Sequence, residues 1–93
     1  MSTIRRAYAL IELNPGKEKE FAGMLADLLD SCKAIKKVDF VYGSFDLVMV
    51  LEGETREVED IVLKVRTLSS VRKTETLLCF EKLLWEDLSG RLT

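Results

Sequence analysis

The chain has 93 residues, of which 47% are hydrophobic and 32% are charged, a balance typical of one globular domain and not of a disordered segment. Its net charge is −2, so it lacks the basic excess that tight binding to nucleic acid normally requires. It contains no histidine, which excludes histidine-based catalysis and most transition-metal sites. We therefore expect no catalytic residues, no metal, no cofactor and no direct contact with nucleic acid.

The N-terminal segment does not resemble a signal peptide, because Glu12 interrupts its apolar run and no small-residue cleavage site follows. No apolar run approaches the roughly 20 residues that a membrane-spanning helix needs. We therefore expect a cytoplasmic protein without a membrane contact. Cys32 and Cys79 are far apart and have no metal-binding spacing. We favour two small buried apolar residues over a disulfide or redox pair, because free cysteines are usually buried.

The first elements predicted along the chain are a strand and a helix. Residues 7–13 are rich in apolar side chains and stop at an Asn-Pro-Gly turn signal, in which Asn14 can cap a following helix. In residues 17–32 apolar side chains recur at every third or fourth position, which predicts an amphipathic helix with one buried face. The apolar residues of this face are Phe21, Met24, Leu25, Leu28, Leu29 and Cys32.

A hairpin is predicted in the middle of the chain. Residues 33–37 read as a polar connection and residues 38–42 as the second strand. A tight turn at Gly43 and Ser44 leads into a third, strongly apolar strand at residues 46–51. The hairpin therefore places an acidic residue at the start of an apolar strand.

The rest of the chain predicts a helix, a strand and a tail. Thr55 is a candidate cap for the second helix. Its apolar stripe comprises Val58, Ile61, Val62, Val65 and Leu68. Residues 71–81 are expected to form the fourth strand, and the tail at residues 82–93 can form a short amphipathic helix. We therefore divide the chain into a domain at residues 1–81 and the tail.

This order of elements predicts an α+β, ferredoxin-like βαββαβ fold, in which both helices cover one face of a four-stranded antiparallel sheet. The other face should be polar in a monomer. However, both alternating sets of side chains are apolar in the long strands. In the third strand Leu47, Met49 and Leu51 point one way and Val48 and Val50 the other, and in the first strand Tyr8 and Leu10 oppose Ala7, Ala9, Ile11 and Leu13. We therefore expect a sheet-to-sheet homodimer. The alternative is that the tail covers this face.

Asp46, Thr74 and Thr76 are candidate ligand-binding residues. A carboxylate beside a glycine turn can bind a ligand ammonium, while free backbone N–H groups bind the ligand's carboxylate. Alternatively, Asp46 caps its own turn. Thr74 and Thr76 alternate along the fourth strand, so their hydroxyls face one side and can line a polar pocket. Threonine is also a common strand residue without any such role.

The order of elements, with V-Y-G-S-F-D-L-V-M-V in the hairpin and V-R-K-T-E-T-L-L in the last strand, resembles the effector-binding (RAM) domain of the Lrp/AsnC transcriptional regulators. In that family the hairpin has a Gly, two residues, an Asp and an apolar strand, and the last strand opens with Val, two residues and Thr-any-Thr. The matching residues here are Gly43, Asp46, Val71, Thr74 and Thr76. The resemblance covers residues 7–81.

The resemblance implies a module that binds a small effector, usually an amino acid, and modulates transcription indirectly through assembly. Family members usually carry an N-terminal helix-turn-helix, for which this chain has no room, so we expect a stand-alone effector domain. The family further implies homodimers that assemble into an octamer or decamer, effectors bound where dimers meet, and mixed assembly with full-length regulators. The ligand-binding residues would then be Gly43, Ser44, Phe45, Asp46, Thr74 and Thr76.

Two other functions stay open at this point. One is a small dimeric ferredoxin-like enzyme, such as a monooxygenase or isomerase. The other is a purely structural assembly unit in which the Gly-Asp turn is only a scaffold. The missing histidine and the lack of an obvious set of proton-transfer groups argue against an enzyme.

Overall fold

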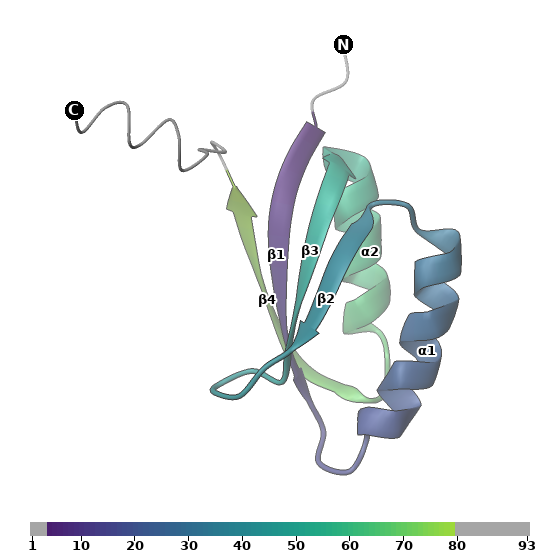
Figure 1. Cartoon of the computed structure of the whole chain (residues 1–93), viewed down its shortest axis with the longest axis vertical. Coiled ribbons are helices and arrows are strands. Elements are labelled where there is room, and N and C mark those ends of the chain that lie inside the picture. Colours follow the sequence, from purple (N-terminus) through teal and green to yellow (C-terminus); the bar gives the residue numbers. More distant parts are fainter. Residues whose placement is uncertain (1–3, 80–93) are drawn as a thin grey trace, which may run out of the picture.

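The computed structural model describes residues 4–79, which form one four-stranded sheet with two helices on the same side (Figure 1). The elements in chain order are β1 (Ile4–Leu13), α1 (Glu18–Ser31), β2 (Ile35–Phe40), β3 (Leu47–Glu54), α2 (Thr55–Arg66) and β4 (Val71–Cys79). The strand order is β2-β3-β1-β4, and all three pairings are antiparallel. The predicted α+β, ferredoxin-like βαββαβ fold is therefore confirmed.

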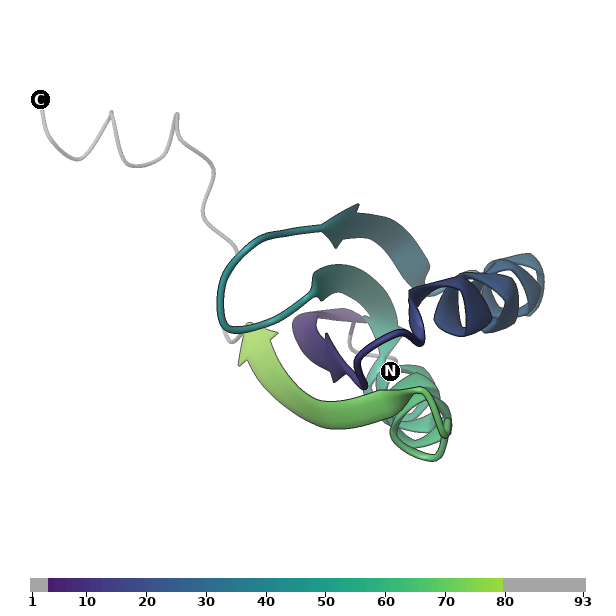
Figure 2. The ribbon, with the colours of Figure 1, turned by 90° about the horizontal axis from the view of Figure 1, so that it is seen from below.

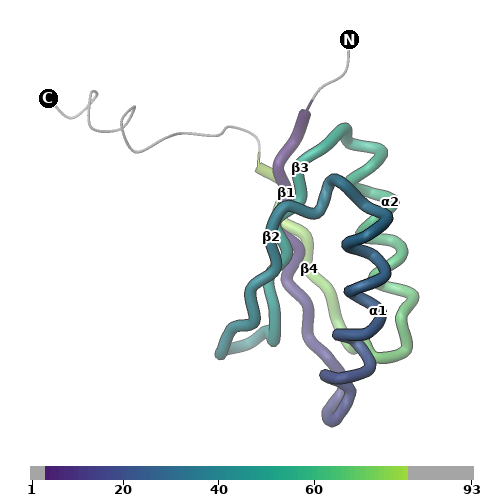
Figure 3. The backbone as a smooth tube through the Cα atoms, turned by 45° about the vertical axis from the view of Figure 1, so that its right-hand side comes forward, coloured from purple at the N-terminus to yellow at the C-terminus, as the bar shows by residue number. Residues whose placement is uncertain are grey.

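The helices pack on one face of the sheet, where the core lies (Figures 2 and 3). Alternate residues of β1 and β3 are buried there, because side chains along a strand point to opposite faces. The buried apolar residues of β1 and β3 on this face are Ala7, Ala9, Ile11, Leu13, Leu47, Met49 and Leu51. The helices contribute Phe21 and Leu25 from α1, and Val58, Ile61 and Val65 from α2. None of the described helices is long and apolar enough to cross a membrane.

The hairpin differs from its prediction in two respects, the start of β2 and the length of the loop between β2 and β3. β2 begins at Ile35 and not at residue 38, because Ile35 is buried and pairs with Leu51 of β3. β2 is an edge strand whose exposed lysines resemble a polar connection in the sequence. The link to β3 is also longer than a tight turn, since it runs over residues 41–46 and projects from the end of the sheet (Figure 1).

Both predicted helix caps are wrong. α1 begins at Glu18, after Lys17, and the carbonyl of Asn14 instead accepts the N–H of Lys17 at 3.1 Å. Thr55 is the first residue of α2, and the cap is Glu54. Glu54 forms a capping box with Glu57, in which each side chain accepts the other residue's backbone N–H. A carboxylate can thus replace the hydroxyl that the sequence pattern favoured.

The apolar face of α1 is narrower than predicted. Met24 and Leu29 are 42% and 47% exposed, whereas Leu28 and Cys32 pack against the core. Within residues 4–79 neither cysteine forms a disulfide, in line with the favoured interpretation, but both are half-buried and so less buried than predicted. Residues 80 and 81 of the predicted fourth strand and the predicted tail at residues 82–93 lie outside the described residues.

Candidate functional site

Asp46 stands directly before β3 and connects three segments of the chain. Its backbone N–H donates to the Ile11 carbonyl at 2.9 Å, and its own carbonyl accepts the N–H of Val41 at 2.9 Å. The carboxylate Oδ2 accepts the N–H of Leu13 at 2.7 Å. The carboxylate therefore caps the end of β1, on the neighbouring strand, where the alternative interpretation expected a cap on its own turn.

The hairpin loop supplies a small pocket beside Asp46. A pocket of about 290 Å³ has Asp46 in its wall, together with Leu13, Glu18, Phe40, Val41 and Tyr42. Phe40 is 61% exposed and Tyr42 is fully exposed, so aromatic surface at the loop faces solvent. An aromatic rim beside a carboxylate is suited to a small polar ligand or to another protein chain.

Gly43, Ser44 and Phe45 form the rest of the predicted loop site. The backbone φ angle of Gly43 is +138°, a value that residues other than glycine rarely adopt. Ser44 is exposed, and Phe45 is half-buried. The Lys73 Nζ lies 5.8 Å from the centroid of the Phe45 ring, within cation–π range. This contact links the loop to β4.

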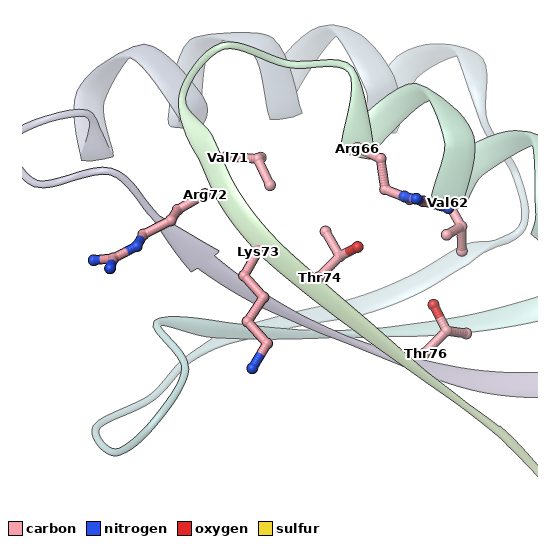
Figure 4. Close-up of a pocket in the computed structure, with 7 residues that line it drawn as sticks. All are labelled: Val62, Arg66, Val71, Arg72, Lys73, Thr74 and Thr76. Atoms are coloured by element: carbon pink, nitrogen blue, oxygen red, sulfur yellow. The ribbon is translucent and has the colours of Figure 1, made fainter.

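Thr74 and Thr76 lie together on the helix-facing side of β4. Thr74 pairs with Ile11 and Thr76 with Ala9, and both of these β1 residues point into the core. The two threonines line a groove of about 540 Å³ between β4 and α2 (Figure 4). Their predicted common orientation is therefore confirmed.

The structure does not bring Asp46 and the two threonines into one pocket. β1 lies between them, since Asp46 bonds to Ile11 and Leu13 from the β3 side and Thr74 pairs with Ile11 from the β4 side. Asp46 lines the loop pocket, and the threonines line the groove beside α2. Within one chain, a single small ligand in either pocket would contact only one of the two sets.

Three cations, Arg66, Arg72 and Lys73, also line the groove beside the threonines, and the sequence did not single them out. Arg66 lies four residues after Val62, so the two share one face of α2, and this spacing was the available signal. Arg72 is 3.5 Å from Glu12, while Lys73 lies over Phe45. Among the described residues, no group of three or more His, Cys, Asp or Glu side chains could hold a metal ion.

The sheet face away from the helices is the second candidate site, and we call it the open face. Its centre is a band of apolar side chains, because Tyr8 pairs with Val50 and Leu77, and Leu10 pairs with Val48. Leu77 is 48% exposed and the other four are half-buried. The two-sided apolar pattern that the sequence predicted is therefore present in the folded chain.

Ion pairs border this band at both ends. Arg6 Nη2 lies 3.2 Å from Glu52 Oε2 at one end, and Arg72 lies 3.5 Å from Glu12 at the other. Hydrogen bonding to Tyr8, and then to Glu52, raises the pKa of Arg6 above its ordinary value. An apolar centre with a polar border is the usual composition of a protein–protein interface.

No protein-family model and no curated protein matches this sequence. Among solved structures, FFRP-DM1 is 24% identical, with a TM-score of 0.67 over 82% of this chain and 99% of its own length. AsnC from E. coli is 20% identical, with a TM-score of 0.67 over 86% of this chain and 53% of its own length. The chain has the fold of the Lrp/AsnC effector domain.

A further structure with this Lrp/AsnC domain fold is the feast or famine regulatory protein (Rv3291c) from M. tuberculosis, which was solved with L-methionine. It is 20% identical, with a TM-score of 0.66 over 86% of this chain and 52% of its own length. The chain thus corresponds to nearly all of FFRP-DM1 and to about half of the two longer regulators. The resemblance seen in the sequence is confirmed at the level of the fold.

Proposed function

We propose that this chain is a regulatory module that binds a small effector, most simply an amino acid, and thereby changes its own assembly. The observation that carries this proposal is the match to whole FFRP-DM1 and to half of a regulator that was solved with L-methionine. The proposed effector-binding residues are Gly43, Ser44, Phe45, Asp46, Thr74 and Thr76. The proposed action on transcription is indirect, in the cytoplasm and without a DNA contact by this chain.

We further propose that the open face forms a homodimer and that dimers assemble into an octamer or decamer, alone or with full-length regulators. The apolar band of Tyr8, Leu10, Val48, Val50 and Leu77 supports the dimer. Asp46 and the threonines line separate pockets, so an effector that contacts both sets would lie between chains. Such an effector stabilises the assembly by its higher affinity for the assembled state.

We expect at least one of the twenty amino acids to bind and to change the particle size. Isothermal titration calorimetry gives the binding heat, and sedimentation velocity gives the size with and without each ligand. L-Methionine is the first ligand to test, because it accompanies a structure of the same fold. If no amino acid gives heat or a change in sedimentation, the effector role is wrong.

A purely structural role for Asp46 has support of its own, because its carboxylate accepts the Leu13 N–H at 2.7 Å. Asp46→Ala leaves this N–H without its acceptor, and we expect it to lower the free energy of unfolding by about 1–3 kcal/mol. Asp46→Asn keeps an acceptor oxygen and removes only the charge. If Asp46 also binds a ligand ammonium, Asp46→Asn weakens effector binding by about tenfold or more while retaining most of the stability.

Urea denaturation and calorimetry on both variants separate the two roles. Asp39→Asn is the matched control, because Asp39 is a carboxylate of the adjoining strand β2 that lines no part of the loop pocket. We expect this control to bind the effector like the unmodified protein. Unchanged effector affinity in Asp46→Asn would assign Asp46 to the scaffold alone.

A further inference from the structure

The groove beside Thr74 and Thr76 continues into a second, apolar pocket. The groove occupies about 540 Å³ and the second pocket about 350 Å³. Val62, Arg66 and Thr76 line both, so the two cavities adjoin along β4 and α2. We call the combined cavity the edge groove, because β4 is an edge strand of the sheet. Its two ends differ in chemistry.

The polar end has one cation that is placed with the hydroxyls. Figure 4 shows Arg66 on α2 with its guanidinium beside Val62, on the side of β4 that carries Thr74 and Thr76, whereas Arg72 and Lys73 extend away from α2. Arg72 and Lys73 also have contacts of their own, with Glu12 and Phe45. Within residues 4–79, neither threonine hydroxyl makes a hydrogen bond and Arg66 makes no ion pair. One guanidinium and two hydroxyls are thus left to receive an anion.

The apolar end exposes aliphatic side chains that the helix layer leaves uncovered. Val58 is buried, but Leu63 and Leu78 are 54% and 55% exposed and face one pocket from opposite walls, α2 and β4. Leu78 lies two residues after Thr76, about 6–7 Å along the strand. A short aliphatic chain attached to an anion at Thr76 can therefore cover Leu78.

We infer that the edge groove binds a small aliphatic carboxylic acid, with its carboxylate on Arg66 and the two threonine hydroxyls and its alkyl group between Leu63 and Leu78. The inference rests on the proposed function in one respect, since Thr74 and Thr76 belong to the proposed effector site. It adds Arg66 and the apolar pocket to that site. It also specifies the ligand class by charge and shape.

An α-ammonium group is not needed for this binding mode. Glu59 is the one carboxylate in the lining of the two cavities, and it lies seven residues from Arg66 on α2, about 10 Å along the helix axis. An α-ammonium lies next to its own carboxylate, so it would be beside Arg66 and far from Glu59. Asp46 lies across β1 in the other pocket. A simple carboxylic acid therefore binds at least as well as the amino acid of the same shape.

Titration followed by ¹⁵N NMR of the full chain tests the inference, with 4-methylpentanoate, acetate and L-leucine as the three probes. We expect 4-methylpentanoate to shift the amide signals of Thr74, Thr76 and Leu78 and to bind at least tenfold more tightly than acetate. A fully buried methylene contributes about fourfold in affinity, so even partial burial of four extra carbons gives this difference. We expect L-leucine to bind no more tightly than 4-methylpentanoate.

Arg66→Gln removes the guanidinium, and Arg56→Gln is its matched control. Both residues are exposed and on α2, but Arg56 lines neither cavity. We expect Arg66→Gln to weaken 4-methylpentanoate at least tenfold and Arg56→Gln to leave its affinity within twofold. Unchanged affinity in Arg66→Gln, equal affinity for acetate, or amide shifts confined to the hairpin loop would each overturn the inference.

The outcome separates this inference from the proposed function. If the carboxylic acid binds in the edge groove and no amino acid changes the particle size, the inference holds and the assembly proposal fails. If an amino acid changes the particle size while 4-methylpentanoate leaves the amide signals of β4 in place, the effector proposal holds and the edge-groove inference fails.

Discussion

Replacing Val50 with lysine is expected to dissociate the proposed open-face homodimer into monomers. Val50 lies in the apolar band of the open face, beside Tyr8, which is flanked by Leu77 on the other side. A twofold interface presents each residue twice, so the substitution places two unpaired ammonium groups in one apolar contact. Burying an unpaired charge costs several kcal/mol, so we expect the dissociation constant to rise by about a thousandfold or more.

Sedimentation velocity at micromolar concentration measures this change. The fold of Val50→Lys should persist, because Val50 is only half-buried within one chain and a lysine there can extend its ammonium into water. Met24→Lys is the control, since Met24 is 42% exposed on α1, on the other side of the sheet. We expect the control to remain dimeric. A monomeric unmodified protein, or a dimeric Val50→Lys variant, would show that the open face is not the dimer interface.

The sequence alone predicted the fold class and both faces of the central strands. The reason is that β1 and β3 alternate regularly over their length, and period-two alternation assigns each side chain to a face. The pairing of β1 with both β3 and β4 then places Tyr8 next to Val50 and Leu77 on one face. The apolar band is therefore a direct consequence of two local patterns.

Elements at the edges of the sheet were predicted less well. Strand β2 starts three residues earlier than predicted, because an edge strand can carry an exposed lysine such as Lys37, which still pairs with Val50. Met24 and Leu29 have the spacing of a buried face, yet both are exposed. Helical spacing shows which side chains share a face, but it does not show how far the neighbouring layer extends over that face.

The sequence indicated which residues are candidates for the site, but it did not indicate their contacts or their positions relative to one another. The partner of the Asp46 carboxylate is the N–H of Leu13, 33 positions away in the chain, and no local pattern indicates such a contact. The separation of Asp46 from Thr74 by β1 depends on the strand order, which brings β3 and β4 to opposite sides of β1. Arg66 was not predicted as a site residue, although its spacing from Val62 places both on one face of α2.

Helix α1 is attached to the sheet through few buried side chains, and a substitution of Phe21 tests how much this attachment contributes to stability. α1 has only two buried residues, Phe21 and Leu25, and Phe21 is fully buried in the core. Phe21→Ala should lower the free energy of unfolding by about 3–5 kcal/mol, through lost transfer energy and the cavity that is left. The total free energy of unfolding of a single domain is only about 5–15 kcal/mol, so this loss is a large part of it.

Urea denaturation of Phe21→Ala in the Val50→Lys background measures this loss without a contribution from dimer dissociation, because association would otherwise stabilise the folded state. Met24→Ala is the matched control, since Met24 lies three residues later on the same helix and is 42% exposed. We expect the control to cost less than about 1 kcal/mol, in line with substitutions at exposed positions. Equal losses in the two variants would mean that α1 does not anchor to the sheet through Phe21, and the helix layer would then have to be held by its loops and by α2.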